Sequence, residues 1–299
     1  MSDQSRSVSS DNHQEKTSAT HKEPPRKTPR IFAHRGSAVL APENTRPAFD
    51  LALQHDASVL ETDVRTSKDG VPVIHHDAKL DRTTDGQGFV SNYTLQELKQ
   101  LDAGYHFRSL SGDSFRGKGI TILTLEEMLE LYRDTEINVE IKHPKPEFAK
   151  TVATVIQNSG RADSVTVASF HSGVTEAFRI AAPNINTAAT REEIRQQFYR
   201  QFSPGNLFKR FFDKNQQTES KSTNPRSAYS TLQIPTQFKF VGIAFELTDA
   251  DFIDYLHQQG LTVTYWTINN VEEMVLLANR GADGIVTDRP DLAAKVFGL

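Results

Sequence analysis

Residues 31–64 read IFAHRGSAVLAPENTRPAFDLALQHDASVLETDV, and this stretch decides the fold. The apolar run Ile31–His34 predicts a β-strand, Pro42–Thr45 predicts the start of a helix, and Val59–Asp63 predicts a second strand. A strand, a helix and a further strand in this order form a unit whose two strands run parallel. The stretch therefore indicates an α/β protein built on a parallel sheet.

The same alternation continues to the end of the chain. Short β-branched runs predict nine strands, at Ile31–His34, Val59–Asp63, Val71–His75, Ile137–Ile141, Ser164–Ser169, Ile185–Ala189, Phe240–Phe245, Thr262–Trp266 and Gly284–Thr287. Helix signals lie at Thr124 with Glu127 three residues later, at Asp249–Gln259 and at Asn270–Arg280. We expect a TIM-type (β/α)₈ barrel, which needs eight strands, so one candidate is a short accessory strand or no strand.

The link between the second and third strand candidates is unusually short. Only seven residues separate Asp63 from Val71, too few for a crossover helix, which needs about ten or more. If both strands were parallel, the link would have to run back in an extended form, with Asp69-Gly70 at the turn. We therefore expect an irregular barrel.

Two segments interrupt the alternation. Residues 77–123 follow the third strand candidate, are rich in glycine and polar residues, and carry one short helix signal at Thr94–Leu101. We expect them to form a small subdomain over the top of the barrel. Residues 195–235 are rich in Gln, Asn and Ser, which indicates a long insertion on the sixth connection from strand to helix.

Part of the second insertion is both basic and aromatic. Within residues 195–226, seven Lys or Arg face two Asp or Glu, and six aromatic residues lie between Phe198 and Phe212. Such a segment predicts a lid over the active site, or peripheral contact with an anionic membrane. The alternative is that its aromatic residues pack on the flank of the barrel.

The composition fits one catalytic domain, residues 31–299, preceded by a disordered tail, residues 1–30. The chain has 299 residues, 37% of them hydrophobic, which is enough for one sizeable core. The tail contains almost no large apolar side chain. The net charge of -4 gives no general attraction to phosphate polymers, so nucleic acid is not predicted as a partner. No obligate protein partner is inferred.

Two absences narrow the chemistry and the location. The chain has no cysteine, which excludes disulfides, thiolate metal sites and a cysteine nucleophile, and suits a reducing compartment. It also has no apolar run long enough for a secretory signal or a membrane span. We therefore expect a cytoplasmic protein that contacts a membrane at most peripherally.

Three carboxylates lie at the ends of strand candidates. Glu61 and Asp63 are two residues apart on one strand, so both side chains point to the same side. Glu140 and Lys142 repeat that spacing at the end of another apolar strand. Two like charges this close are costly unless a cation lies between them. An all-oxygen site suits Mg²⁺ or Ca²⁺ rather than zinc.

Histidines end the first and third strand candidates. His34 is followed by Arg35; a histidine transfers protons near neutral pH, and a guanidinium binds phosphate oxygens. Of His75 and His76, one should face the barrel mouth and the other away, but the alternation alone does not choose between them. Taken singly, each of these residues also fits a solvated loop.

A series of short motifs resembles the glycerophosphodiester phosphodiesterase family. The motifs are His34–Gly36, Pro42–Thr45, Glu61–Val64, Asp69–Val73, His76–Asp77, Leu80–Thr84, Leu123–Glu127, Glu140–Lys142, Ser169–Phe170, Trp266–Asn269 and Gly281–Asp288. They occur in the family's order across residues 31–297. Each is short, but the ordered set is specific.

The resemblance implies a role for each matched position. The implied roles are metal ligands for Glu61, Asp63 and Glu140, an acid/base pair for His34 and His76, and phosphate contacts for Arg35 and Lys142. Glu43 would be a further ligand or a carboxylate behind the ligands, and Trp266 a wall against the glycerol or alcohol group. One divalent cation, Mg²⁺ or Ca²⁺, is the implied cofactor.

The implied reaction is hydrolysis of a glycerophosphodiester to sn-glycerol 3-phosphate and an alcohol. One histidine would deprotonate the attacking oxygen, of water or of the glycerol 2-hydroxyl, and the other would protonate the leaving alcohol. The residues do not say which histidine does which. One alternative is a lysophospholipase D that cuts the same bond in a lysophospholipid, which the basic aromatic segment favours. A remote alternative is a non-catalytic phosphate-binding barrel.

Overall fold

Eight parallel strands form a nearly closed barrel in the computed structural model, which describes residues 28–110, 112–202, 229–240 and 243–299. The strands are β1 (Arg30–Ala33), β2 (Val59–Thr66), β4 (Glu136–Ile141), β5 (Val165–Ala168), β6 (Asn186–Thr187), β7 (Thr231–Ile234), β10 (Thr262–Tyr265) and β11 (Gly284–Thr287). Each pairs with the next of these strands except that β6 and β7 are the two ends of the sheet, and β11 pairs with β1. A parallel bridge between Ala188 and Thr231 joins β6 to β7. The expected (β/α)₈ fold is confirmed.

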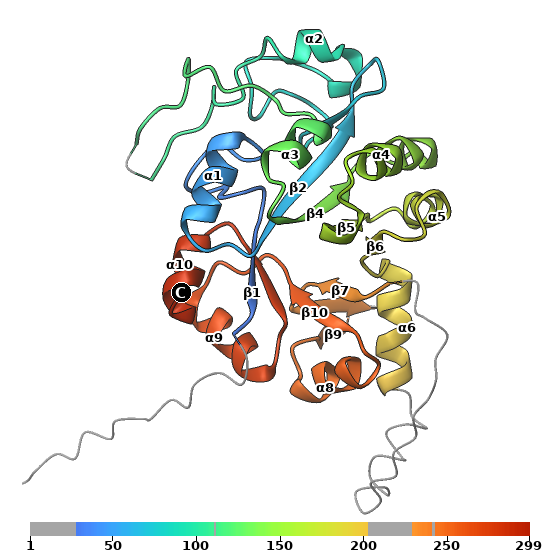
Figure 1. The fold of residues 1–299 in the computed structure, drawn as a ribbon. Helices are drawn as coiled ribbons and strands as arrows, with labels where there is room; N and C mark the ends of the chain where they lie inside the picture. Colours follow the sequence, from blue (N-terminus) through green and yellow to red (C-terminus); the bar gives the residue numbers. More distant parts are fainter. Residues whose placement is uncertain (1–27, 111, 203–228, 241–242) are drawn as a thin grey trace, which may run out of the picture.

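Helices surround the ring of strands (Figure 1). They are α1 (Arg46–Gln54), α3 (Leu125–Leu131), α4 (Pro146–Asn158), α5 (Ser172–Ala181), α6 (Arg191–Phe202), α8 (Ala250–Gln258), α9 (Val271–Arg280) and α10 (Pro290–Phe297). Alternate residues of the strands face these helices: on β4, Ile137, Val139 and Ile141 belong to the main apolar core. Asn138 and Glu140 point instead into the barrel, because successive side chains of a strand alternate.

The helix signals in the sequence are confirmed. Thr124 caps α3, and the side chain of Glu127 accepts from the backbone of Thr124 in return. Asp249 and Asn270 cap α8 and α9 through their side chains. Gly281 ends α9 with a φ of 97°, in the left-handed region that favours glycine.

The strand predicted at Val71–His75 is not a barrel strand. It forms β3 (Pro72–Ile74), which pairs antiparallel with β2. The short link that follows Asp63 is therefore a hairpin connection, as its length allows, and not an extended return between parallel strands. Because β3 is not one of the eight barrel strands, the insertion at 77–123 follows the second barrel strand, β2, and lies on the second connection from strand to helix. The long insertion was predicted on the sixth connection from strand to helix, but its first residues belong to α6, and most of the rest of it follows α6 and precedes β7.

The first insertion builds a small core of its own. Seven buried apolar residues form it, namely Val73, Leu80, Val90, Leu98, Ala103, Ile120 and Ile122. The expected short helix is present as α2 (Leu95–Leu98), with Thr94 and Glu97 making reciprocal capping hydrogen bonds. This subdomain stands at one side of the barrel, at the top of Figure 1.

Two further predictions around residue 235 are wrong. Thr231–Ile234, assigned to the insertion at 195–235, is the barrel strand β7. The strand predicted at Phe240–Phe245 is instead parts of β8 (Gln237–Phe240) and β9 (Ile243–Glu246), which form a separate antiparallel pair. Strand β7 was not predicted from the sequence, because this strand follows a long polar stretch and carries Gln233 on its inward face.

The structure describes only part of the predicted tail and of the predicted insertion at 195–235. Residues 1–27, most of the predicted tail, lie outside the described residues, and Arg30 already belongs to β1. Residues 203–228 also lie outside them, while α6 covers the start of the basic aromatic segment. Phe198 of α6 is buried, with its ring 6.0 Å from that of Phe252 on α8. This residue packs on the flank of the barrel.

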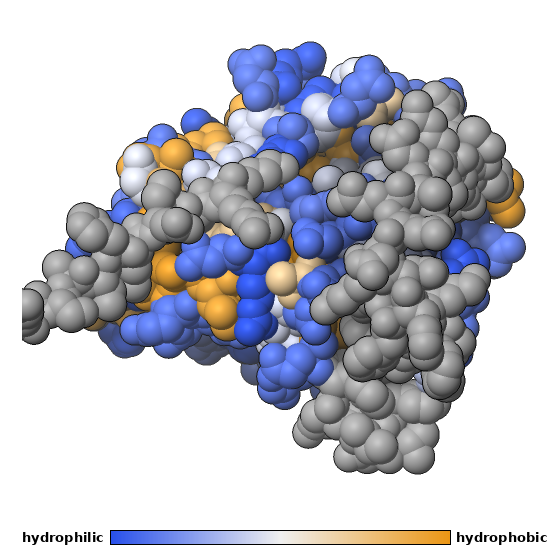
Figure 2. Space-filling model, turned by 90° about the horizontal axis from the view of Figure 1, so that it is seen from below, coloured by the Kyte–Doolittle hydropathy of each residue, from blue (hydrophilic) through white to orange (hydrophobic). Residues whose placement is uncertain are grey.

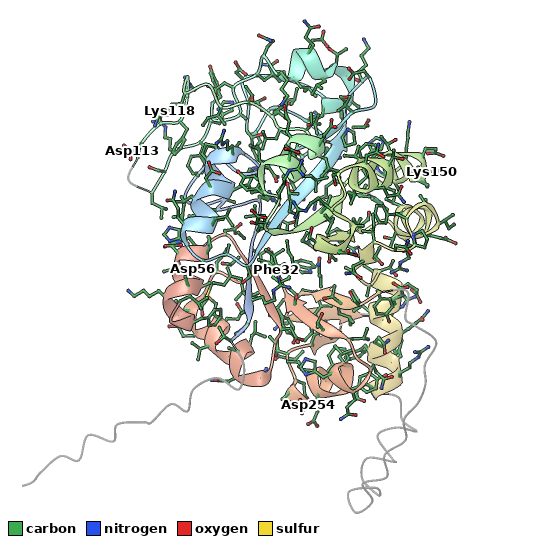
Figure 3. All side chains as sticks on the ribbon, in the orientation of Figure 1. Phe32, Asp56, Asp113, Lys118, Lys150 and Asp254 are labelled. Atoms are coloured by element: carbon green, nitrogen blue, oxygen red, sulfur yellow. The ribbon has the colours of Figure 1, made fainter. Side chains whose placement is uncertain are left out.

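Figure 3 shows Phe32 near the centre of the ribbon, whereas Lys150 and Asp254 lie at its periphery. A side chain at Gly284 would meet the Phe32 ring at 2.6 Å, so glycine makes room for that ring inside the barrel.

The face in Figure 2 is mostly hydrophilic, with smaller hydrophobic patches. Among the described helices, none offers a stretch both long and apolar enough to cross a membrane.

Candidate active site

Three carboxylates from two adjacent strands converge inside the barrel mouth. Asp63 on β2 lies beside Glu140 on β4 in the parallel register, and Glu61 is two residues earlier on β2. One oxygen of each lies within 4.8 Å of the others, and Glu61 and Asp63 are buried. The spacing of two residues on a strand thus does place Glu61 and Asp63 on the same side.

The protonation of the three carboxyl groups shows how strongly they interact. Burial and the neighbouring Asp63 raise the pKa of Glu61 to about 7. Burial also raises the pKa of Glu140, even against the nearby ammonium of Lys142. Burial alone would raise the pKa of Asp63 as well, but Lys142 and Arg35 outweigh it and hold that pKa below its usual value. The protein alone therefore does not neutralise this cluster.

The donor chemistry of the cluster fits a divalent cation. Asp63 Oδ1 and Glu140 Oε1 are buried and accept no hydrogen bond, although Lys142 Nζ lies 3.3 Å and 2.8 Å from them. Buried carboxylates are costly unless cations balance them, and the three carboxylates of the cluster have only Lys142 and Arg35 against them among the described residues. Oxygen ligands from carboxylates are those that Mg²⁺ and Ca²⁺ prefer.

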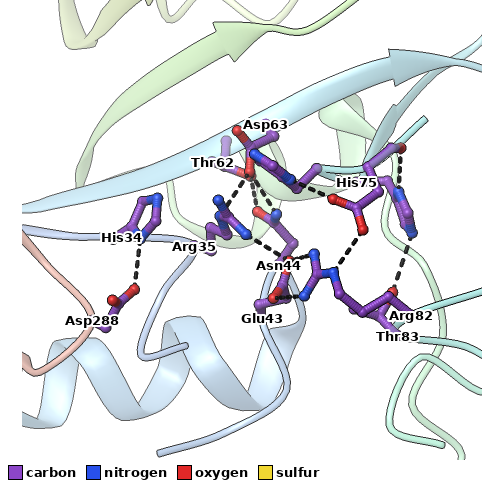
Figure 4. Close-up of polar contacts among 12 residues, drawn as sticks. His34, Arg35, Glu43, Asn44, Thr62, Asp63, His75, Arg82, Thr83 and Asp288 are labelled. Atoms are coloured by element: carbon purple, nitrogen blue, oxygen red, sulfur yellow. Dashed lines mark hydrogen bonds and ion pairs between the residues drawn. The ribbon is translucent and has the colours of Figure 1, made fainter. Parts of the chain in front are cut away.

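His34 follows β1 and is held by a carboxylate from the other end of the chain. Its Nδ1 lies 2.6 Å from Asp288 Oδ1, as Figure 4 shows. Asn269 donates to the other oxygen of Asp288 at 2.7 Å. Burial alone would lower the pKa of His34, but the hydrogen bond to Asp288 and the negative charges of Glu61 and Asp288 together outweigh it, so the pKa is raised. His34 also lines the main cavity.

His76 has a carboxylate partner of the same kind. Its Nδ1 lies 2.6 Å from Asp77 Oδ1, and Arg82 holds the other oxygen of Asp77 at 2.6 Å. Burial lowers the pKa of His76. His75 points elsewhere: it is buried, its Nδ1 lies 2.9 Å from the Asp77 carbonyl oxygen, and its Nε2 lies 3.2 Å from Thr83 Oγ1. His76 lines the main cavity and His75 does not.

Two cations lie against the carboxylate cluster. Lys142 Nζ is 2.8 Å from Glu140 Oε1, and Arg35 Nε is 3.4 Å from Asp63 Oδ2. The backbone N–H of Arg35 also donates to Glu61 at 2.9 Å. Arg35 adopts a φ of 52°, followed by Gly36 at 84°. A side chain on Gly36 would meet the Ala48 backbone at 2.7 Å, so this turn needs glycine to hold Arg35 against the cluster.

Glu43 lies beside the cluster, outside the group of three carboxylates found among the described residues. Its carboxylate receives Arg35 Nη1 at 3.0 Å and the Arg82 guanidinium at 2.6 Å and 2.7 Å. These contacts lower the pKa of Glu43 despite its burial. Glu43 therefore holds Arg35 and Arg82 (Figure 4), and Arg82 in turn donates to Asp77.

The residues border one cavity of about 250 Å³. Its lining includes His34, Arg35, Glu61, His76, Glu140, Lys142 and Trp266, and adds Asn138, Phe170, Arg191, Ile194 and Gln233. Asp63 lies behind this lining, within the carboxylate cluster. Trp266 packs edge-on against Phe170 with ring centroids 5.7 Å apart, and the two form an aromatic wall. The cavity thus offers charged side chains next to an aromatic wall.

Comparison with known proteins identifies the family. The glycerophosphoryl diester phosphodiesterase family matches residues 34–292. The chain belongs to this family. A glycerophosphodiester phosphodiesterase from Bacillus altitudinis is 33% identical over 273 residues, which cover 89% of this chain and 97% of the relative.

Solved structures of glycerophosphodiester phosphodiesterases share the fold. One from Agrobacterium tumefaciens has a TM-score of 0.69 and 27% identity, covering 89% of this chain and 99% of its own. A phosphodiesterase from Oleispira antarctica, solved in complex with the product sn-glycerol-3-phosphate, has a TM-score of 0.64 and 25% identity. The match covers 91% of this chain and 98% of that one.

Several residues of this glycerophosphodiester phosphodiesterase site were not singled out in the sequence. Asp77, Arg82 and Asp288 belong to motifs that carry the resemblance, yet the motifs alone gave them no role. Asn44 also lies in one of these motifs and was given no role. It donates to Asp63 Oδ2 at 2.9 Å and orients that carboxylate. Arg191 lies in no such motif, and only the packing of α6 brings it to the cavity.

Proposed function

We propose that the protein hydrolyses glycerophosphodiesters to sn-glycerol 3-phosphate and an alcohol, with one divalent cation held by Glu61, Asp63 and Glu140. The observation that carries the proposal is the group of three converging carboxylates, which borders the same cavity as two carboxylate-held histidines. The product complex of the Oleispira antarctica phosphodiesterase supports the same class of ligand. When bound, the cation, Mg²⁺ or Ca²⁺, would neutralise charge on the phosphate.

Arg35 and Lys142 are the proposed phosphate contacts. Both are partly buried cations at the edge of the carboxylate cluster that line the cavity, so a non-bridging oxygen placed in the cavity can accept from them. Their own pKa values are raised by Asp63 and its neighbours against burial, so both stay charged at neutral pH. Fixed cations of this kind stabilise the charge that develops on the phosphate oxygens.

His34 and His76 are the proposed proton carriers. Each presents one ring nitrogen to a carboxylate and so leaves the other for the substrate. The raised pKa of His34 supports it as the donor of a proton to the leaving alkoxide. The lowered pKa of His76 supports it as the acceptor of the proton from the attacking hydroxyl. The proton taken by His76 and the proton given by His34 balance the hydrolysis.

The lysophospholipase D alternative is not favoured by the relatives, which carry the name glycerophosphodiester phosphodiesterase. Contact of residues 195–226 with a membrane stays a prediction. Purified protein incubated with glycerophosphoglycerol should release sn-glycerol 3-phosphate, measured by a coupled dehydrogenase assay, and EDTA should abolish the release. Lysophosphatidylcholine serves as the parallel substrate. Faster cleavage of the lysolipid would favour the alternative, and no cleavage of either would contradict the proposed function.

A further inference from the structure

The rim of the main cavity carries one cation with no carboxylate partner among the described residues. Arg191 is the first residue of α6 and lines the cavity. The two acids that follow it are engaged elsewhere. Glu192 pairs with Arg195, and Glu193 pairs with Arg179 at 2.7 Å. The Arg191 guanidinium is therefore available to a ligand.

The aromatic wall holds Arg191 in place. Its guanidinium carbon lies 4.5 Å from the centroid of the Phe170 ring, which in turn packs on Trp266. Lys142 Nζ lies 5.4 Å from the centroid of the same ring. Lys142, a proposed phosphate contact, and Arg191 therefore both lie near the Phe170 ring. A substrate bound to Lys142 that extends along the wall reaches Arg191.

Arg191 differs from the other cations of the site, because no carboxylate among the described residues pairs with it. Arg35 and Lys142 lie against the carboxylate cluster, and Arg82 pairs with Glu43 and Asp77. An anionic group on the alcohol side of the substrate can therefore pair with Arg191.

We propose that Arg191 determines specificity by selecting glycerophosphodiesters whose alcohol carries a second anionic group, such as a further phosphate. This inference rests on the proposed function. An alcohol that carries a quaternary ammonium is disfavoured, because the Phe170 ring, which could attract it, already lies next to two cations. Arg191 touches the substrate's second group and takes no part in the proton transfers.

The test compares three substrates that differ in the charge of the alcohol. Bis(glycerophospho)glycerol carries a second phosphate, glycerophosphoglycerol is neutral beyond the scissile phosphate, and glycerophosphocholine is cationic. Arg191→Gln should lower kcat/KM about tenfold on the first, as the loss of a charge-assisted hydrogen bond implies, and change the second by less than about twofold. Arg191→Glu should shift preference toward glycerophosphocholine. The selective loss should shrink as NaCl is raised.

Arg195→Gln is the matched control, because it removes the same charge from α6 at a residue that pairs with Glu192 and does not line the cavity. Its kcat/KM should stay unchanged on all three substrates. Equal loss on all three substrates in Arg191→Gln, or no loss on any, would overturn the inference.

A binding measurement separates this inference from the proposed function. Trp266 is the only tryptophan and lines the cavity, so its fluorescence reports occupancy. In a His76→Asn background, where turnover is slow, bis(glycerophospho)glycerol should bind about tenfold more weakly after Arg191→Gln. If the wild type cleaves none of the substrates, the proposed function fails, and this titration still decides the role of Arg191. Equal affinity in the two variants would contradict that role.

Discussion

Asp288 Oδ1 lies 2.6 Å from His34 Nδ1, so a residue that follows the last barrel strand holds a histidine that follows the first. The contact exists because β11 pairs with β1 and thereby brings both ends of the barrel together. The carboxylate stabilises the charged imidazole and raises its pKa against the effect of burial. This pair gives the first test of the proton transfers.

Asp288→Asn should move the alkaline limb of kcat/KM to lower pH. Loss of the carboxylate favours the neutral imidazole, so the pKa of His34 falls, and His34 as proton donor then loses its proton at lower pH. The pH profile on glycerophosphoglycerol measures the shift. Asp291→Asn is the control, because Asp291 pairs with Arg289 at 2.7 Å and does not touch His34. An alkaline limb that stays in place in Asp288→Asn would remove His34 from the donor role.

His76→Asn should be severe and His75→Asn mild. A general acid or base contributes about 10²–10⁴ in rate, and His76 lines the cavity with its partner Asp77 behind it. His75 is buried and bonded to the Asp77 carbonyl, so its replacement should cost mainly stability. Turnover rates and urea unfolding of both variants provide the comparison. The reverse ranking of turnover rates would mean that His75 carries the proton transfer.

Phe198→Ala should destabilise the protein by about 3 kcal/mol, because a buried phenylalanine leaves a cavity when truncated. Phe198 packs against Phe252, so the loss should appear as a lower urea midpoint. Tyr199→Ala, at an exposed neighbour, should change stability by less than about 0.5 kcal/mol. Similar small effects of both changes would show that α6 does not depend on this contact.

The barrel and its cluster of carboxylates could be predicted because they depend on short-range periodicity. The spacing of two residues places Glu61 and Asp63 on one side of β2 regardless of the rest of the fold. The helix caps at Thr124 and Asn270 are equally local. By contrast, alternation could not choose between His75 and His76, because β3 ends at Ile74 and both histidines lie beyond it.

The features that were missed depend on long-range packing. Strand β7 is only four residues long and is recognised by its pairing with β10, not by its composition. The contact between His34 and Asp288 spans 254 residues. Arg191 reaches the cavity only because α6 docks on the barrel beside α8. No local pattern contains these relationships.

The central claim is that Glu61, Asp63 and Glu140 hold one divalent cation on which hydrolysis depends. Titration calorimetry of the metal-stripped protein with Mg²⁺ and with Ca²⁺, followed by activity measurements on the same samples, tests it most directly. We predict one bound ion per chain for the wild type, and loss of both binding and roughly 100-fold or more of activity in Glu61→Gln, with the fold retained by circular dichroism. Full activity of the stripped protein in EDTA, or near-normal activity of Glu61→Gln, would contradict the claim.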